Sequence, residues 1–583
     1  MDRIYLSSCG IIPGCDITEK LHEIFNAHPS DTEFVFDKGD YYFSPKLSRD
    51  YRLSNTDVIP ERKLGIWLRD MKNIKIDCSG SRFLFSGHMS AVTLDNCENV
   101  EIRNCIIDWP KPLAAEGIVT GSGDGYIDMF VSSDIFPHRY RDGWLEFDVG
   151  NGEWYPMSRY SHIQFDAVTR TVRRASGDRF SAKTIEDLGG DIYRFGCGYT
   201  DTSIGNIFVL RHNERMHAGI FTERCRSIVF EDITFHSCGG LGCLAQFCTD
   251  LTYRRVNFLP NTKAGRKVAN GRDDGMHITC CSGRVTITEC SFTGLMDDPI
   301  NVHGCCVTAA EAVDSRTLRC RFRHPQAQGF FYWAKAGDEI AFIERRHMET
   351  LGTLRASGYS LETRDTFLIS FESDIPSRYL EMIADPECMA LDNLTNTAEF
   401  VCTDNRFGSC RARGILVSTP KPVLIARNIF ASSGCAVLVA GDANYWFESG
   451  ACHDVEIRDN VFTDACLSSM YQFCEGIISI CPVVPEPKTD KPFHSNIRIT
   501  GNRFDTPDTP VLYAFSCKGL NFTGNTITSS PCADKWHGGT ALIKLDHCID
   551  AELSGNLKVG LFNLNDIETA DCENIRWNGK KRQ

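Results

Sequence analysis

The chain has 583 residues and a formal net charge of −14, which argues against nucleic acid or an anionic polymer as a partner. No apolar run of roughly 18 residues occurs, so the sequence predicts no membrane-spanning helix. The 28 cysteines show no regular disulfide or zinc spacing, which suits a reducing compartment. The first residues lack the apolar centre of a signal peptide, so we expect a cytoplasmic protein; removal of an export signal would instead allow a secreted or periplasmic location.

The first predicted element is a helix over residues 16–25, with Asp16 as its N-cap. Its position before the first strand pattern predicts that it covers the open end of the fold that follows. Such a cover would protect strand edges that otherwise lack partners.

A repeat of the form apolar-x-apolar-x-x-(Asn, Cys or apolar)-x-apolar begins at Val100 and recurs to Ile527, with steps of about 23 residues where no loop intervenes. The alternation predicts strands with one buried face, and the fixed recurrence predicts stacked coils. The sixth position is often Asn, which tolerates bends and forms ladders when stacked. Cys105 and Cys290 at this position are interpreted as small buried hydrophobes. The pattern predicts an all-β fold, a right-handed parallel β-helix.

Two stretches interrupt the repeat but still carry alternating runs, so we interpret them as small inserted β-domains that are barrel-like. Insertions in a solenoid tend to lie on one face, often the binding face. The predicted organisation is an N-terminal cap with the first coils, an inserted domain, coils that carry two aspartate pairs, a second inserted domain, and C-terminal coils, at residues 1–109, 110–210, 211–304, 305–395 and 396–583 respectively.

The two aspartate pairs are Asp273-Asp274 and Asp297-Asp298, which lie one repeat apart and each precede a bend residue, Gly or Pro. Stacked coils would place both pairs on one wall, where like charges raise one another's pKa. Three polar residues, His277, Asn301 and His303, are expected to project outward beside them, so the sequence predicts an exposed cluster open to a groove. An inverting glycosidase needs one protonated carboxyl group and one carboxylate of this kind.

The aspartate pairs also allow a structural and a metal-binding interpretation. Asp-Gly and Asp-Pro are ordinary bend signals, so the pairs could serve only to shape the bends. Clustered carboxylates are also preferred ligands of Ca²⁺.

A loop from Gly441 to Gly450 contains three consecutive aromatic residues followed by Glu448. An exposed ring such as that of Trp446 can contact the C–H face of a sugar, and Glu448 could bind hydroxyl groups. The alternative is that the aromatic side chains pack onto the coil.

The aspartate pairs, the segment from Pro299 to Gly304, the loop from Asn444 to Glu448 and the two β inserts resemble glycoside hydrolase family 110 over residues 16 to 560. The resemblance implies an exo-acting, inverting α-1,3-galactosidase that removes galactose from blood group B or linear α-1,3-galactosyl glycans. It implies catalytic roles for Asp274, Asp297 and Asp298. The substrate-binding candidates are Asp273, in a supporting role, with His277, Asn301, His303, Trp446 and Glu448.

We expect Asp298 or Asp297 as the acid and Asp274 on the base side. We expect an oligosaccharide or glycoconjugate substrate, with no cofactor, metal, nucleic acid or membrane; a homo-oligomer is an open alternative. The rival enzymes are a polygalacturonase-like hydrolase, which would need cations for a uronate, and a Ca²⁺-dependent pectate-lyase-like enzyme, for which Arg272 is the nearby base candidate. A carbohydrate-binding or adhesive solenoid is the interpretation that is not an enzyme.

Overall fold

The computed structural model describes residues 1–59, 61–160, 162–212, 215–327, 330–385, 387–470, 475–536 and 541–582. Strands account for 49% of the residues and helices for 5%, which confirms the all-β class. None of the helices in these ranges combines the length and the apolar character that crossing a bilayer requires.

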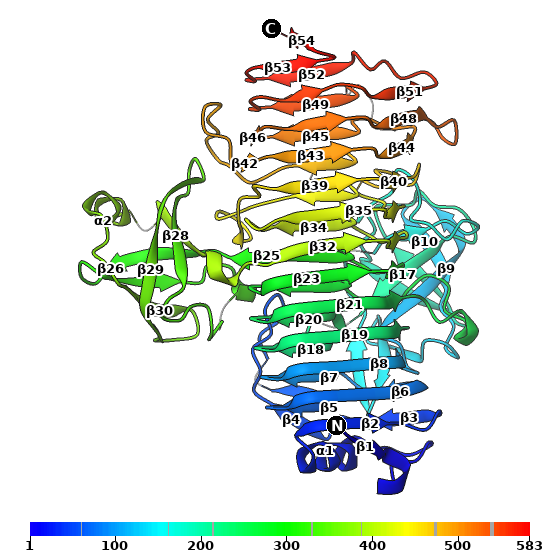
Figure 1. Cartoon of the computed structure of the whole chain (residues 1–583). Coiled ribbons are helices and arrows are strands. Elements are labelled where there is room, and N and C mark those ends of the chain that lie inside the picture. The colour runs from blue at the N-terminus through cyan, green and yellow to red at the C-terminus, as the bar shows by residue number, and fades with distance from the viewer. Residues whose placement is uncertain are drawn as a thin grey trace.

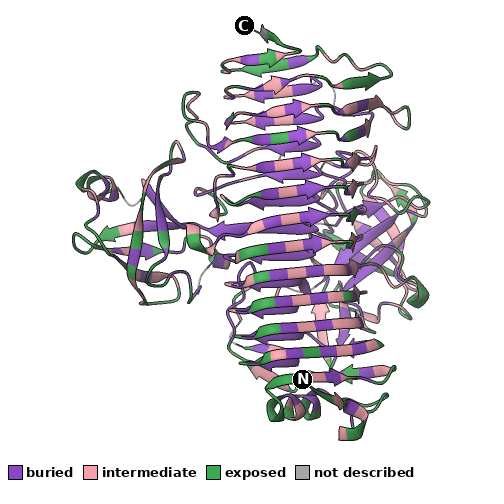
Figure 2. Ribbon diagram, in the orientation of Figure 1, coloured by how far each residue is buried: buried purple, intermediate pink, exposed green. Residues whose placement is uncertain are grey.

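Parallel strands stack into a right-handed β-helix, as predicted (Figure 1). In the described part of the chain, one wall is a 23-stranded sheet and a second wall is a 14-stranded sheet. In the first wall, β19 (Arg226–Phe235), β21 (Thr249–Phe258) and β23 (Ser282–Thr288) pair in the predicted register. The second wall includes β18 (His217–Glu223), β20 (Gly240–Gln246), β22 (Met276–Thr279) and β25 (Ile300–Cys305). The apolar positions of both walls form one continuous buried core. The coils are accordingly marked largely as buried in Figure 2.

A ladder of buried asparagines runs through the C-terminal coils. The side-chain N–H of Asn428 donates to Asn460 Oδ1 at 3.0 Å and to the carbonyl of Cys402 at 2.9 Å. The same pattern links Asn405, Asn428, Asn460, Asn502, Asn525 and Asn556. The prediction of a ladder is confirmed and extends one coil further. Cys105 and Cys290 are both buried, as expected.

The first insert leaves the solenoid after β8 (Glu98–Asp108) and returns before β18. The coil register is kept across it, because β8 pairs directly with β19. The larger sheet of this insert is open, so in the described residues its strands do not close into a barrel. This sheet is β14 (Gln164–Phe165), β17 (Ile207–Arg211), β9 (Ala114–Gly123), β10 (Tyr126–Phe130), β16 (Ile192–Gly196) and β15 (Thr184–Gly189), and the smaller sheet is β11 (His138–Arg141), β12 (Trp144–Gly150) and β13 (Glu153–Pro156).

The second insert is a closed six-stranded barrel with its own apolar core, as the barrel-like prediction required. Coil register is again kept, because β25 pairs with β34 (Ile415–Ser418). The two inserts project to opposite sides of the solenoid in Figure 1. The barrel strands are β26 (Val307–Ala312), β27 (Thr317–Arg321), β30 (Thr366–Phe371), β29 (Glu349–Leu361), β28 (Glu339–Glu344) and β31 (Met389–Asn393), with helix α2 (Ser377–Ile383) beside them.

Helix α1 (Thr18–Ala27) covers the N-terminal end of the solenoid, as predicted (Figure 1). Its N-cap is Ile17, so the predicted cap at Asp16 is wrong by one residue. The Asp16 carboxylate nevertheless accepts the backbone N–H of Thr18 at 3.0 Å, because its side chain reaches past the cap to the first turn. Leu21 and Phe25 attach the helix to the core of the first coils.

Candidate active site

Three successive coils contribute the same bend position to one wall. The register of β22, β25 and β34 places Asp274, Asp298 and Arg413 at one position of consecutive coils. The backbone N–H of Gly275 donates to the carbonyl of Asp298 at 2.9 Å, which joins the first two bends directly. The predicted alignment of the two aspartate pairs is therefore confirmed.

Gly275 is required by the close approach of these bends. A Cβ atom there would lie 2.6 Å from the carbonyl oxygen of Pro299 and 2.8 Å from the side chain of Leu295. Only glycine permits the two coils to stack at this point without a shift of backbone.

The aspartates border a pocket of about 280 Å³, close to the lower end of ligand pockets in general, about 300 Å³. Seven of the nine predicted residues line it, namely Asp274, His277, Asp297, Asp298, Asn301, Trp446 and Glu448. The other two, Asp273 and His303, do not line it and are buried. The prediction of an exposed cluster is wrong: Asp274 and Asp298 are 4% and 2% exposed, because loops and both inserts cover this wall.

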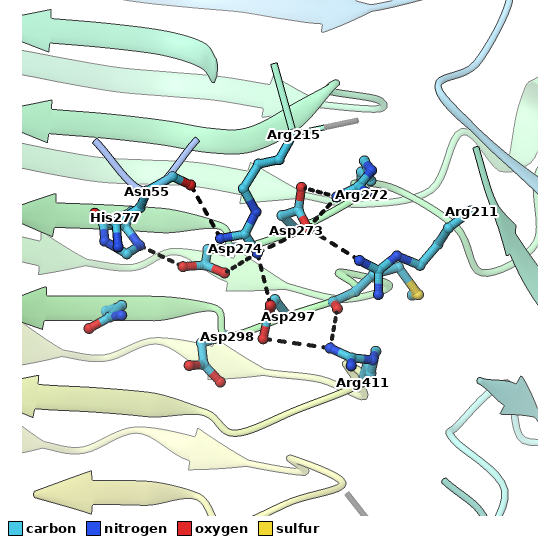
Figure 3. Close-up of polar contacts among 12 residues, drawn as sticks. Asn55, Arg211, Arg215, Arg272, Asp273, Asp274, His277, Asp297, Asp298 and Arg411 are labelled. Atoms are coloured by element: carbon cyan, nitrogen blue, oxygen red, sulfur yellow. Dashed lines mark hydrogen bonds and ion pairs between the residues drawn. The ribbon is translucent and has the colours of Figure 1, made fainter. Parts of the chain in front are cut away.

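Arg215 lies at the centre of the carboxyl groups (Figure 3). Its Nη2 atom lies 3.0 Å from Asp273 Oδ1, 3.0 Å from Asp297 Oδ2 and 3.8 Å from Asp274 Oδ1. The other terminal nitrogen of Arg215, Nη1, donates to the backbone carbonyl of Asn55 at 3.4 Å. One cation thus holds both aspartate pairs together at a buried site where like charges would otherwise repel.

Asp273 is an anchor for these cations. It is fully buried and accepts hydrogen bonds from Arg272 at 2.7 Å and Arg215 at 3.0 Å, with Arg211 at 3.4 Å. Burial alone would raise its pKa, but the three guanidinium groups outweigh burial and hold the pKa of Asp273 well below its usual range. A carboxylate held in this way supports the site from behind the pocket wall.

Asp274 has a different environment. Its Oδ2 atom lies 2.6 Å from Nδ1 of His277, and its nearest guanidinium contact is the long one to Arg215. Burial, followed by the nearby Asp297 carboxylate, raises the pKa of Asp274 well above its usual range, while Arg215 opposes the shift. This environment favours the protonated form.

Asp297 and Asp298 are each paired with arginine. Asp297 has the most accessible carboxyl group of the four, with 19% of its side chain exposed, and its Oδ1 lies 3.7 Å from Arg411. Burial would raise its pKa, but Arg411 and Arg215 outweigh burial and lower the pKa of Asp297. Asp298 accepts from Arg413 Nε at 2.9 Å and Nη2 at 2.7 Å. Burial raises the pKa of Asp298 to about 6, although Arg413 opposes the shift.

The aromatic loop forms another side of the pocket. Strand β38 (Glu448–Ser449) pairs antiparallel with the end of β25, which directs Glu448 to the site. Glu448 accepts from Asn55 at 3.3 Å and from Asn301 at 3.4 Å. The side-chain oxygen of Asn301 is buried and has no hydrogen-bond partner in the described chain, so it is available to a hydroxyl donor.

Trp446 lies at the pocket rim with 43% of its surface exposed. Its ring lies 4.7 Å, between centroids, from the ring of His324 in the barrel insert. Tyr445 is 68% exposed, whereas Phe447 is buried. Of the three aromatic side chains, Phe447 therefore packs inward as the alternative interpretation expected. Tyr445 and Trp446 stay accessible.

Sequence reasoning did not find the pocket arginines or the two amides on distant loops, namely Arg211, Arg215, Arg411, Arg413, Asn55 and Gln326. A signal for two of them existed. Residues 411–415 read Arg-Ala-Arg-Gly-Ile and align with Met-Asp-Asp-Pro-Ile at 296–300 once the second insert is bridged. The remaining four depend on loop packing that no repeat encodes.

A metal ion is one conceivable occupant of the cluster of His277, His303 and Glu448, whose ligand atoms lie within 4.8 Å of one another. The two Nε2 atoms of the histidines, however, are 2.8 Å apart and share a hydrogen bond. A cation would have to displace that proton and separate the rings. The cluster therefore fits a hydrogen-bonded chain better than a preformed metal centre.

A larger, open groove of about 810 Å³ lies elsewhere, bordered by Asp250, Arg284, Glu339 and Lys421. It contains none of the residues of the aspartate pairs. The smaller pocket is the better candidate active site, because it alone of these two unites buried carboxyl groups with opposed pKa shifts.

The chain is similar to known proteins over nearly its full length. An α-1,3-galactosidase B from Bacteroides thetaiotaomicron is 36% identical over 568 residues, which cover 95% of this chain and 90% of that protein. An α-1,3-galactosidase A from Bacteroides fragilis is 30% identical and covers 98% of this chain and 95% of that protein. Residues 317–380, within the barrel insert, match the family model described as GLAA-B beta-barrel domain II.

Among solved structures, a family 28 exopolygalacturonase from Yersinia enterocolitica matches with a TM-score of 0.42 and 11% identity, covering 99% of this chain and 79% of that chain. The galactosidase relatives show that the chain is a glycoside hydrolase. The chain belongs to the α-1,3-galactosidase family, glycoside hydrolase family 110.

Proposed function

We propose that this protein is an exo-acting, inverting α-1,3-galactosidase that removes terminal galactose from glycans of the blood group B type, of the linear α-1,3-galactosyl type, or both. The observation that carries the proposal is that Asp274 and Asp297 line one small pocket and have pKa shifts in opposite directions. Pairs of carboxyl groups that differ in this way divide acid and base roles between them.

We assign Asp274 as the general acid. It is buried, its pKa is raised, and its carboxyl group lies 2.6 Å from an imidazole nitrogen, whereas its contact with Arg215 is a long one of 3.8 Å. This reverses the assignment expected from the sequence, which placed Asp274 on the base side. The reason is that the arginines missed in the sequence stabilise negative charge on Asp297 rather than on Asp274.

We assign the base side to Asp297, assisted by Asp298. Asp297 is ionised by its arginine neighbours and has the most accessible carboxyl group of the four aspartates. Both oxygens of Asp298 accept hydrogen bonds from Arg413, so this residue has less capacity to take a proton from water. Its role is to orient the water beside Asp297.

In the reaction, Asp274 gives its proton to the glycosidic oxygen, which keeps the electron pair of the breaking bond to C1. Asp297 takes a proton from a water molecule, whose oxygen bonds to C1 from the opposite face. The products are β-galactose and the alcohol of the remaining glycan. Exchange with solvent then returns the proton from Asp297 and restores it to Asp274.

The size of the pocket supports removal of a single terminal sugar. Its volume of about 280 Å³ and the loops that cover it suit one buried sugar unit rather than the middle of a polysaccharide chain. The rest of the bound glycan would extend out of the pocket past Trp446 at the rim.

A uronate hydrolase is the second candidate, because a specific observation now favours it. The sequence disfavours it, since no cationic motif for a uronate was found near the aspartate pairs, yet four arginines line the pocket. All four lie against aspartate carboxylates, which leaves their charge largely balanced. This balance favours a neutral sugar.

A proton NMR time course with blood group B trisaccharide and with linear α-1,3-galactobiose tests the proposal. We expect galactose to appear first as the β anomer. Release as the α anomer would contradict inversion. Release from neither glycan, together with cleavage of polygalacturonate, would establish the second candidate; parallel reactions with a chelator would identify a Ca²⁺-dependent lyase.

A further inference from the structure

We infer that His303, acting through His277, is a positioning residue that holds the acid proton on Asp274. The inference rests on the proposed function, because it explains how the acid assigned there is kept ready. It comes from three consecutive short contacts that run from the pocket into the wall.

The contacts form a single hydrogen-bonded chain. Asp274 Oδ2 lies 2.6 Å from His277 Nδ1, and His277 Nε2 lies 2.8 Å from His303 Nε2. The chain ends where His303 Nδ1 lies 2.6 Å from the carbonyl oxygen of Gly304. Each contact is short enough to be a hydrogen bond, so each must contain one proton.

The direction of these bonds follows from their last member. A carbonyl oxygen can only accept, so His303 must carry its proton on Nδ1. A neutral His303 then presents a lone pair at Nε2, and His277 must donate from its own Nε2. A neutral His277 in turn accepts at Nδ1, which leaves Asp274 as the donor. The geometry thus assigns a protonated carboxyl group to Asp274, provided that both rings are neutral.

Burial keeps the rings neutral. The exposed fractions of His277 and His303 are 1% and 6%. Burial lowers the pKa of His277 to about 4, although Glu448 opposes the shift, and it also lowers the pKa of His303. Two competing arrangements have an ionised Asp274, with the imidazolium either at His277 beside it or at His303. Both require a pair of charges in a buried wall.

Glu448 favours the arrangement with an imidazolium at His303, since its Oε1 lies 3.5 Å from His303 Nε2. Its carboxylate already accepts from the amides of Asn55 and Asn301, so it does not depend on an imidazolium for a partner. The other charged groups that face Asp274 come from every neighbouring segment. They are Asp273 on its own bend, Arg215 before β18, and Asp297 and Asp298 on the next coil.

The fold supplies this chain through the coil register. His277 and His303 lie on adjacent strands, β22 and β25, in positions offset by two residues, because His303 pairs with Thr279. Their rings meet edge to face with centroids 4.9 Å apart. Strand β38 closes over the end of β25 and shields the pair.

Substitution of His303 tests the role of the chain. His303→Phe keeps an aromatic ring but removes the acceptor that faces His277, whereas His303→Gln retains a carbonyl oxygen of similar reach. We expect His303→Phe to lose roughly 10²-fold in kcat/KM on a disaccharide, whose leaving group needs the acid. On an activated nitrophenyl α-galactoside the loss should be much smaller, and His303→Gln should retain most activity on both.

The pH profile separates this role from a purely structural one. Loss of the acceptor frees Asp274 to lose its proton more easily, so the basic limb of kcat/KM should move to lower pH in His303→Phe. An equal loss on both substrates with an unchanged basic limb would overturn the inference. Absence of galactose release by the unsubstituted enzyme would instead contradict the proposed function.

A measurement that needs no activity tests the tautomers directly. In the enzyme labelled with ¹⁵N-histidine, with His277→Gln and His303→Gln used for assignment, we expect His277 to be protonated only at Nε2 and His303 only at Nδ1 at neutral pH. A doubly protonated His303, or a proton on Nδ1 of His277, would overturn the inference even if His303→Phe failed to fold.

Discussion

Arg413 lies one coil beyond Asp298, at the same position of the repeat, and binds both oxygens of that carboxylate through Nε and Nη2. The backbone N–H of Arg413 adds a third hydrogen bond to Oδ1 at 3.0 Å. The guanidinium charge lowers the pKa of Asp298, which burial raises, and the backbone N–H helps to fix the position of the carboxyl group.

Replacement of Arg413 should shift the acidic limb of the activity profile. Arg413 lowers the pKa of Asp298, which burial raises to about 6, so Arg413→Met should raise this pKa further. Asp298 would then remain protonated to higher pH, and the acidic limb of kcat/KM should move upward. Arg413→Lys keeps the charge but loses the bidentate hydrogen bonding, so it should shift the acidic limb less. An unmoved acidic limb in Arg413→Met would exclude Asp298 from the base side.

Asp274→Asn should remove acid catalysis selectively. We expect a loss of about 10²-fold or more in kcat on α-1,3-galactobiose, and a smaller loss on a nitrophenyl α-galactoside, whose leaving group needs little protonation. Asp404→Asn is a matched control, because Asp404 is an exposed carboxylate paired with Arg427 on the coil surface. Similar losses on both substrates would point to a base or binding role for Asp274.

Asp297→Asn should lower activity on both kinds of substrate by about 10²-fold or more, since water then lacks its base. Azide brings its own electron pair and needs no deprotonation. Added azide should therefore restore turnover of the nitrophenyl substrate and yield the β-galactosyl azide, which product NMR identifies. The α-azide as product would be evidence against inversion.

Trp446→Ala should weaken binding of the glycan beyond the terminal galactose. The exposed indole at the rim offers an apolar face worth about 0.5–1.5 kcal/mol in aromatic contacts, so KM for blood group B trisaccharide should rise up to about tenfold. The change in KM for a small nitrophenyl galactoside should be less. Tyr445→Ala is the control, because Tyr445 is more exposed and does not line the pocket.

Asn460→Ala should destabilise the C-terminal coils. It leaves the backbone N–H and one side-chain N–H of Asn428 without their acceptor, Asn460 Oδ1, at a cost of about 1–3 kcal/mol for each unsatisfied group. Asn26→Ala, on the exposed face of α1, should change stability by less than about 0.5 kcal/mol. Denaturant unfolding measures the change in the free energy of unfolding for both variants. Equal changes would mean that the asparagine ladder contributes nothing to stability.

The sequence predicted the coils and the aspartate register because both depend on a local period. Asn428 and Asn460, or Asp274 and Asp298, recur at fixed positions, so their stacking could be inferred without a structure. Arg215 could not be found in this way, since its place beside three aspartates depends on how the chain returns from the first insert. The acid and base roles depended on these cations, which is why the sequence favoured the opposite assignment.

The second insert separates Asp298 from Arg413 in the chain yet leaves them stacked in adjacent coils. The barrel is thus an insertion in the chain that does not alter the register between the coils of Asp298 and Arg413. Among its described residues, Gln326 lines the pocket and His324 lies beside Trp446. On the proposed function, substitutions in the barrel would act on the part of the glycan outside the pocket and leave the stacking of the aspartate pairs unchanged.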